Sequence, residues 1–160
     1  MVAVKNILVP IDFSTASDAA LMYGRALARR FGARLHVLHV VENAFLRPTV
    51  ADPHAVEASA LQRLSEQLTD DDRDHLRVAA ATVKSDAPAV EIAAYAKASG
   101  IDLIVMGTHG RSGVSHLLIG SVAERVVRTA PCPVLTVRHP EHEFVMPDAG
   151  AEASRAVPGA

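Results

Sequence analysis

The chain has 160 residues, a usual length for one domain and long enough to bury a sizeable hydrophobic core. Hydrophobic residues make up 49% and charged residues 21%, and a formal net charge of -2 argues against an electrostatic hold on nucleic acid or an anionic membrane. The single Cys132 allows no internal disulfide, and the apolar run near the N-terminus is too short for a signal peptide or a membrane span. We therefore expect a cytoplasmic protein.

Short apolar runs rich in β-branched residues alternate with longer segments whose apolar residues recur every three or four positions. The runs predict five strands, at Asn6–Ile11, Leu35–Val41, Leu76–Val83, Leu103–Met106 and Val134–Val137. Runs as continuous as Ile7 to Val9 indicate strands that are buried on both faces, and hence a parallel sheet covered by helices. The strict alternation predicts an α/β fold with right-handed crossovers.

Four helices are expected between these strands. Ser14 or Thr15 can cap the first helix, and Gly32 ends it. The other three are expected from near Pro53 toward Thr69, from Pro88 to Gly100, and from near Gly120 to Pro131. The acidic stretch Asp70 to Asp74 is interpreted as a solvated turn.

The chain is expected to form one domain over residues 1–139. Residues 42–52 are interpreted as a loop. Residues 140–160 mix Ala, Gly, Pro and acidic residues without a period, so we expect a disordered C-terminal tail.

Asp12 stands directly after the first predicted strand. In an open doubly wound sheet, ligands bind at the carboxyl ends of the strands, where the strand order reverses. With the order 3-2-1-4-5, that place lies between the first and fourth strands. The carboxylate there can accept hydrogen bonds from vicinal hydroxyls such as those of ribose, or it can merely cap the first helix. The local sequence leaves both readings open.

The segment after the fourth strand is rich in glycine, with four glycines between Gly107 and Gly120. Glycine lets backbone N–H groups approach a ligand closely, and successive amides form an anion-binding nest. The helix that begins near Gly120 adds free N–H groups and the positive end of its dipole, Ser121 adds a hydroxyl and Arg111 adds a guanidinium. Together these groups suit a polyphosphate. The alternative is an ordinary flexible loop.

The spacing of Gly107, two residues, Gly110, nine residues and then Gly120-Ser121 resembles the nucleotide-binding signature of the universal stress protein family. Three further segments resemble that family's first strand, fourth strand and last-strand entry: residues 5–12, 102–110 and 131–135. The resemblance covers residues 3 to 138. It implies a five-stranded open parallel sheet of order 3-2-1-4-5 with helices on both faces, Rossmann-like and similar to the adenine nucleotide α-hydrolases.

The resemblance also implies ATP binding, with Mg²⁺ carried by the phosphates. Asp12 would hold the ribose, and Pro10, Ile11 and the backbone around Val40 and Val41 would face the adenine. The residues implied around the phosphates are Gly107, Gly110, Arg111, Gly120, Ser121 and Val122, and the set of cofactor-binding residues also includes Met106 and His109. Members of the family commonly dimerise through their last strand, which here is Val134, Leu135, Thr136 and Val137. The function implied is that of a regulatory stress-response module.

Other readings of the sequence are weaker. His36 and His39 lie three apart on a strand, hence on opposite faces, so they cannot share a metal ion, and we expect no metal site. His109 can be proposed as a general base in a slow ATP hydrolase, although a structural loop histidine is the simpler reading. The strand edge at Val134–Val137 also allows a dimeric scaffold without nucleotide. Cys132 is interpreted as a small buried filler.

Overall fold

The computed structural model describes residues 3–41, 53–108 and 119–138, and within them the strands and helices alternate as expected, except that two helices instead of one lie between the second and third strands. The strands are β1 (Asn6–Pro10), β2 (Arg34–Val41), β3 (Ala79–Lys84), β4 (Leu103–Gly107) and β5 (Val134–Val137). The helices are α1 (Thr15–Phe31), α2 (Pro53–Glu66), α3 (Asp70–His75), α4 (Pro88–Ala98) and α5 (Ser121–Thr129).

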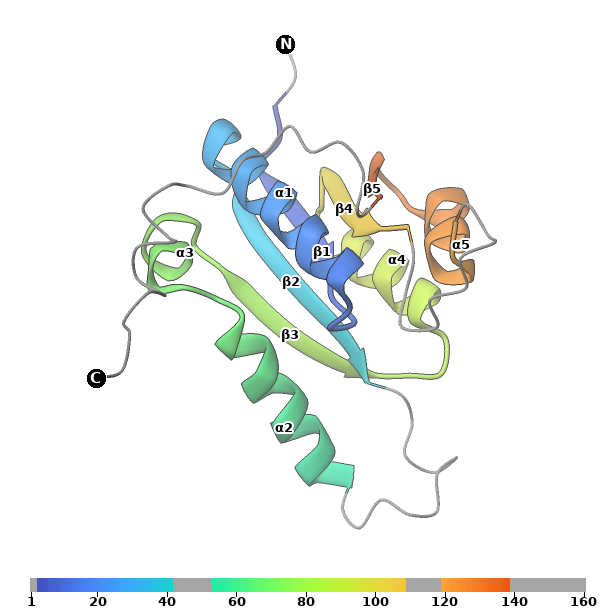
Figure 1. Cartoon of the computed structure of the whole chain (residues 1–160). Coiled ribbons are helices and arrows are strands. Elements are labelled where there is room, and N and C mark those ends of the chain that lie inside the picture. Colours follow the sequence, from blue (N-terminus) through green and yellow to red (C-terminus); the bar gives the residue numbers. More distant parts are fainter. Residues whose placement is uncertain (1–2, 42–52, 109–118, 139–160) are drawn as a thin grey trace, which may run out of the picture.

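The five strands form one parallel sheet in the order β3-β2-β1-β4-β5 (Figure 1). The predicted order 3-2-1-4-5 is therefore confirmed. β1 lies at the centre, and its neighbours are β2 on one side and β4 on the other. The order reverses between β1 and β4, which is where an open α/β sheet binds its ligands.

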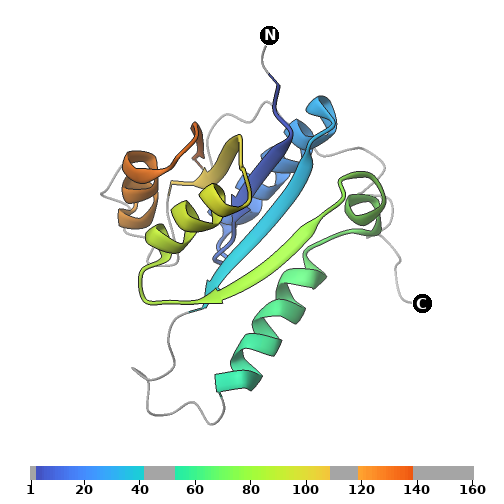
Figure 2. The same cartoon turned by 180° about the vertical axis from the view of Figure 1, so that it is seen from behind.

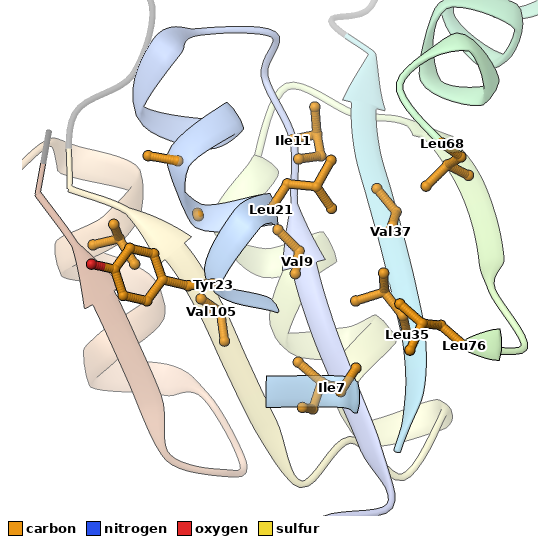
Figure 3. Packing of buried hydrophobic residues seen from close by; sticks show 14 of the residues in the cluster. Ile7, Val9, Ile11, Leu21, Tyr23, Leu35, Val37, Leu68, Leu76 and Val105 are labelled. Carbon is orange, nitrogen blue, oxygen red and sulfur yellow. The ribbon is translucent and has the colours of Figure 1, made fainter. Parts of the chain in front are cut away.

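Two hydrophobic clusters pack on opposite faces of the sheet. α1 and α2 cover one face, while α4 and α5 cover the other (Figures 1 and 2). Alternate side chains of β1 divide between the faces, so Ile7 and Val9 pack toward α1, whereas Leu8 packs toward α4. Leu21 of α1 lies over β1 in the first cluster (Figure 3). Every central strand is thus buried on both faces, as its continuous apolar run predicts.

The ends of α1 follow local signals in the sequence. Ser14, rather than Thr15, is the N-cap, and its Oγ accepts a hydrogen bond of 3.2 Å from the N–H of Ser17. Gly32 ends the helix in the left-handed conformation, at φ 65°, which a glycine adopts without steric cost.

The interpretation of Asp70 to Asp74 as a solvated turn is wrong. Asp70–His75 is helix α3, and it begins with a capping box between Thr69 and Asp72. Asp72 is completely buried, and an ion pair of 2.8 Å with Arg25 of α1 compensates its buried charge. These partners are 47 residues apart in sequence, so a local pattern of acidic residues cannot reveal them. The third strand consequently begins at Ala79, and Leu76 closes the helix instead.

The expected loop 42–52 and tail 140–160 lie outside the described residues. None of the helices in the described ranges is both long and apolar enough to cross a membrane.

Candidate functional site at the carboxyl end of the sheet

β1 and β4 stop pairing before either strand ends. Their register pairs Ile7 with Leu103 and Leu8 with Ile104, yet the strands run on to Pro10 and Gly107. The carboxyl ends of the two central strands therefore part at the point where the strand order reverses. This is the place that the sequence predicts for a ligand.

Asp12 is half-buried at this edge, and Ser14 fixes its orientation. Its Oδ1 accepts hydrogen bonds from the N–H of Ser14 at 3.0 Å and from the Ser14 hydroxyl at 2.5 Å. Because Ser14 is the residue that caps α1, Asp12 supports the cap and is not itself the cap. The reading of Asp12 as a mere helix cap is therefore wrong, and its role toward a ribose stays a prediction.

Two contacts from β2 hold the backbone just before Asp12. The N–H of Ile11 donates to the carbonyl of Leu38 at 2.8 Å, and Nδ1 of the buried His39 lies 2.7 Å from the carbonyl oxygen of Ile11. A carbonyl oxygen only accepts, so Nδ1 of His39 carries the proton. Pro10 is half-buried and Ile11 is buried, so both residues are packed into the domain just before Asp12.

The last residues of β2 extend past the end of β1. Along a strand, backbone groups of alternate residues point to opposite sides. The carbonyl of Leu38 bonds toward β1, while the carbonyl of Val41 accepts from the N–H of Ser85 at 3.0 Å on the β3 side. The N–H and C=O of Val40 therefore face the β1 side, beyond Pro10 where β1 ends. This direction suits the hydrogen-bonding edge of a base at Val40, whereas the carbonyl of Val41 points to the β3 side. The predicted contacts of these residues with adenine stay predictions.

Gly107 ends β4 against the first turn of α1. A Cβ added at Gly107 would lie 2.9 Å from the backbone carbonyl of Ala16, which is too close for any side chain. The glycine thus has a packing reason that is independent of any ligand, because it lets α1 and β4 approach each other at the crevice. Met106, just before it, is buried in the cluster beneath α4 and α5.

Thr108 and Gly120 bring the two ends of the intervening segment together. The N–H of Gly120 donates to the carbonyl of Thr108 at 2.5 Å, and the N–H of Thr108 donates to the carbonyl of Val137 at 3.0 Å. The start of α5 is therefore fixed next to the end of β4. The hydrogen bond from Gly120 to Thr108 therefore brings together the two ends of the glycine-rich segment at the carboxyl end of β4.

Gly120 is the N-cap of α5 and provides no capping side chain. Its φ of -69° and ψ of 154° are the extended values usual for an N-cap. The first N–H groups of a helix lack intrahelical partners and carry the positive end of the dipole. Ser121 is exposed and Val122 half-buried in this first turn, so α5 presents backbone donors to an anion.

A sequence model described as the universal stress protein family matches residues 3–138. The chain belongs to the universal stress protein family. Universal stress protein MJ0531 of Methanocaldococcus jannaschii is 33% identical over 150 residues, which cover 87% of this chain and 85% of that protein. A universal stress protein of Thermus aquaticus is 36% identical over 140 residues, which cover 84% and 98%.

A solved structure of another Methanocaldococcus jannaschii protein, MJ0577, is also similar, with a TM-score of 0.69 at 25% identity over 88% of this chain and 100% of that chain. A universal stress protein in complex with cAMP has a TM-score of 0.58 at 25% identity, covering 86% of this chain and 98% of that one. The predicted family and its span are thus confirmed.

The glycine signature of this universal stress protein is only partly described. The structure places Gly107 at the end of β4 and Gly120 next to it at the start of α5, whereas His109, Gly110 and Arg111 lie outside the described residues. Their predicted roles stay predictions.

Two residues at the site were not assigned to it from the sequence. Phe13 follows Asp12 with a φ of 63°, and its ring centroid lies 4.5 Å from that of His39. A positive φ on a phenylalanine leaves no signal in the sequence. His39 could have been assigned to the site from its sequence position, because it lies near the end of β2, the strand that pairs with β1.

The two histidines of β2 and Cys132 pack among other residues of the fold. His36 faces α4, where its Nδ1 lies 3.1 Å from the Tyr95 hydroxyl, while His39 faces Phe13 on the other side of the sheet, so the prediction of opposite faces is confirmed. Burial, followed by the charge of Arg34, lowers the pKa of His36. Cys132 is half-buried, and burial raises the pKa of its thiol. Within the described ranges, no group of three or more His, Cys, Asp or Glu side chains is placed to hold a metal ion.

Proposed function

We propose that this universal stress protein is a regulatory module that binds ATP at the carboxyl ends of β1 and β4. The observation that carries the proposal is that three features lie at the carboxyl end of the sheet: the carboxylate of Asp12, the backbone of Val40 directed toward the β1 side, and the start of α5 at Gly120, which has no side chain of its own to cap the helix. The relative in complex with cAMP supports an adenine nucleotide as the ligand class. The single cysteine fits a cytoplasmic setting.

Each feature fits one part of the nucleotide. Asp12 would accept hydrogen bonds from the ribose hydroxyls, and the backbone of Val40, next to Val41, would face the adenine beside Pro10 and Ile11. The amides at Gly120, Ser121 and Val122 would donate to phosphate oxygens. The proposal extends this phosphate site to Met106, Gly107, His109, Gly110 and Arg111. Mg²⁺ would arrive with the phosphates, and the Ser121 hydroxyl is an oxygen ligand of the kind it prefers.

The groups proposed around the triphosphate are backbone amides, a hydroxyl, one guanidinium and the imidazole of His109. Such groups bind and orient a polyphosphate, so we propose binding rather than rapid turnover. Acid extraction of nucleotide from the purified protein separates these outcomes. Recovered ATP supports the proposal, and recovery of mainly ADP would favour a slow hydrolase.

Gly120→Asp gives a sharp test, because its two expected effects have opposite signs. Asp is a favoured N-cap and its charge suits the helix dipole, so the variant should be at least as stable as the wild type. The same charge would repel a triphosphate, so ATP affinity measured by calorimetry should fall by about tenfold or more. The matched control is Gly120→Asn, which caps the helix equally well without the charge.

Retained ATP affinity in Gly120→Asp would contradict a phosphate site at the start of α5. An equal loss in Gly120→Asp and Gly120→Asn would mean that bulk, not charge, blocks the site. Wild-type protein that yields no nucleotide on extraction and shows no binding on titration would favour a scaffold without ligand.

We also propose that the protein forms a homodimer through β5. β5 is the last strand of the sheet order and pairs with β4 through the carbonyls of Pro133 and Val137. By the alternation of the strand, the backbone groups of Val134 and Thr136 therefore point away from β4. Thr136→Pro removes one outward N–H and should shift the molar mass in light scattering from dimer to monomer, whereas Thr136→Val should not. A dimer that persists in Thr136→Pro, or a monomeric wild type, would contradict this interface.

A further inference from the structure

Three side chains from three different elements stack beside Asp12. The Cζ of Arg63, on α2, lies 4.2 Å from the centroid of the Phe13 ring, which is within the range of a cation–π contact. On β2, the His39 ring lies 4.5 Å from Phe13 at an interplanar angle of 47°. Phe13 is thus held between a strand of the sheet and a helix that is distant in sequence.

This stack holds a strained residue. Phe13 has a φ of 63°, and a residue with a Cβ in this left-handed region is strained. Such a conformation persists only where the surrounding structure imposes it. Phe13 also packs against the first hydrophobic cluster, so ring contacts on several sides fix it.

The strained turn determines where the Asp12 carboxylate points. Phe13 lies between Asp12 and Ser14, and with this backbone conformation both the N–H and the hydroxyl of Ser14 donate to Oδ1 of Asp12. On the other side of Asp12, His39 holds the carbonyl of Ile11. Asp12 therefore lies between Ile11, whose carbonyl is held by His39, and Phe13, whose ring contacts Arg63.

α2 stays attached to the domain without the help of Arg63. The neighbouring Leu64 is completely buried in the first hydrophobic cluster, and Glu57 forms an ion pair of 2.9 Å with Lys84 at the end of β3. Arg63 itself is exposed. Its replacement should therefore leave the fold intact and change only the stack.

We propose that Arg63, acting through the Phe13 ring, is a positioning residue that orients Asp12 toward the ribose hydroxyls, so that α2 sets the affinity of the crevice for nucleotide. This inference rests on the proposed function. It differs from a purely structural role of Arg63 in one respect: it requires the effect of Arg63 to depend on the two ribose hydroxyls of the ligand.

The test compares the affinities of the full-length chain for ATP and for 2′,3′-dideoxy-ATP, which lacks both ribose hydroxyls. Arg63→Gln should weaken ATP binding roughly threefold to tenfold, the range expected when a stacked cation is lost. Its affinity for 2′,3′-dideoxy-ATP should equal that of the wild type. Arg63→Lys keeps the charge but not the flat guanidinium, and we expect an intermediate effect. Arg30→Gln, at an exposed position in the last turn of α1, makes the same change of charge and should affect neither ligand.

A double variant completes the test. If Arg63 acts through Asp12, then Arg63→Gln should have no further effect on ATP affinity in the background of Asp12→Ala. Additive losses in the double variant, an equal loss for both nucleotides, or unchanged ATP binding in Arg63→Gln would each overturn the inference while leaving the proposed function intact. A wild-type chain that binds no ATP would overturn the proposed function, and this inference with it.

Discussion

Asp12 and Asp72 make similar local contacts in regions of opposite character. Each carboxylate accepts hydrogen bonds from the residue that caps a helix, Ser14 for α1 and Thr69 for α3. Asp72 is fully buried and paired with arginine from α1, whereas Asp12 is half-buried where β1 and β4 part. The comparison teaches that a capping carboxylate serves stability where arginines neutralise it inside the fold. At the edge where the strand order reverses, a similar contact with Ser14 holds the half-buried Asp12, for which we propose a role toward a ligand.

The largest expected effect is on stability, at Asp72. Asp72→Ala leaves the half-buried Arg25 without its carboxylate partner and with only the Gln67 carbonyl, so the free energy of unfolding should fall by about 3 kcal/mol, the lower end of the range for breaking a buried ion pair. Urea denaturation followed by circular dichroism measures the loss. Asp71→Ala is the matched control, because Asp71 is an exposed residue of α3 that also contacts an arginine of α1, Arg29. Similar denaturation midpoints for the two variants would contradict the structural role of Asp72.

The next effect should separate Asp12 from Ser14. Ser14→Ala removes the N-cap of α1 and should cost about 1 kcal/mol of stability. Asp12→Ala should cost less stability than Ser14→Ala but should weaken ATP binding by about tenfold or more, because a charged acceptor is lost. Denaturation measures which of the two variants loses more stability, and calorimetry measures which loses more ATP affinity. We expect Ser14→Ala to lose more stability and Asp12→Ala to lose more affinity. If Asp12→Ala lowers the free energy of unfolding more than the free energy of ATP binding, then Asp12 serves mainly stability, as Asp72 does.

The smallest effect concerns His36, at the amino end of β2. Its pKa is lowered mainly by burial, so the folded state favours the neutral ring and the unfolded state binds more protons. The free energy of unfolding should then be level above about pH 6.5, the ordinary histidine pKa, and should decrease as the pH falls below it. His36→Gln should flatten this decrease between about pH 5 and 7. An unchanged slope in the variant would show that other groups carry the pH dependence.

Much of the fold could be predicted because its signals are local. The apolar runs of β1 and β4 give the buried parallel strands, and Ser14 and Gly32 mark the ends of α1. Helix α3 was missed because its key contact, from Asp72 to Arg25, joins segments that are far apart in sequence.

The positions of some candidate site residues could be predicted, whereas their roles toward a ligand stay predictions. Asp12 and Gly120 are single residues that stand directly after a strand or before a helix, so the sequence places them at the sheet edge. The strained φ of Phe13 was not predictable, because the contacts that impose it come from His39 and Arg63 in other elements. Gly107 carries a packing role, against Ala16, that the glycine pattern alone does not separate from ligand binding.

The most direct test of the nucleotide site is an amide NMR titration of the wild-type chain with magnesium and ATP. The account predicts that the largest shift changes fall at the carboxyl end of the sheet, at Asp12, Val40, Thr108 and Gly120 to Val122, while amides near Asn6 and Asp102 at the opposite end stay unchanged. Shift changes confined to the opposite end of the sheet, or none at saturating ATP, would contradict it.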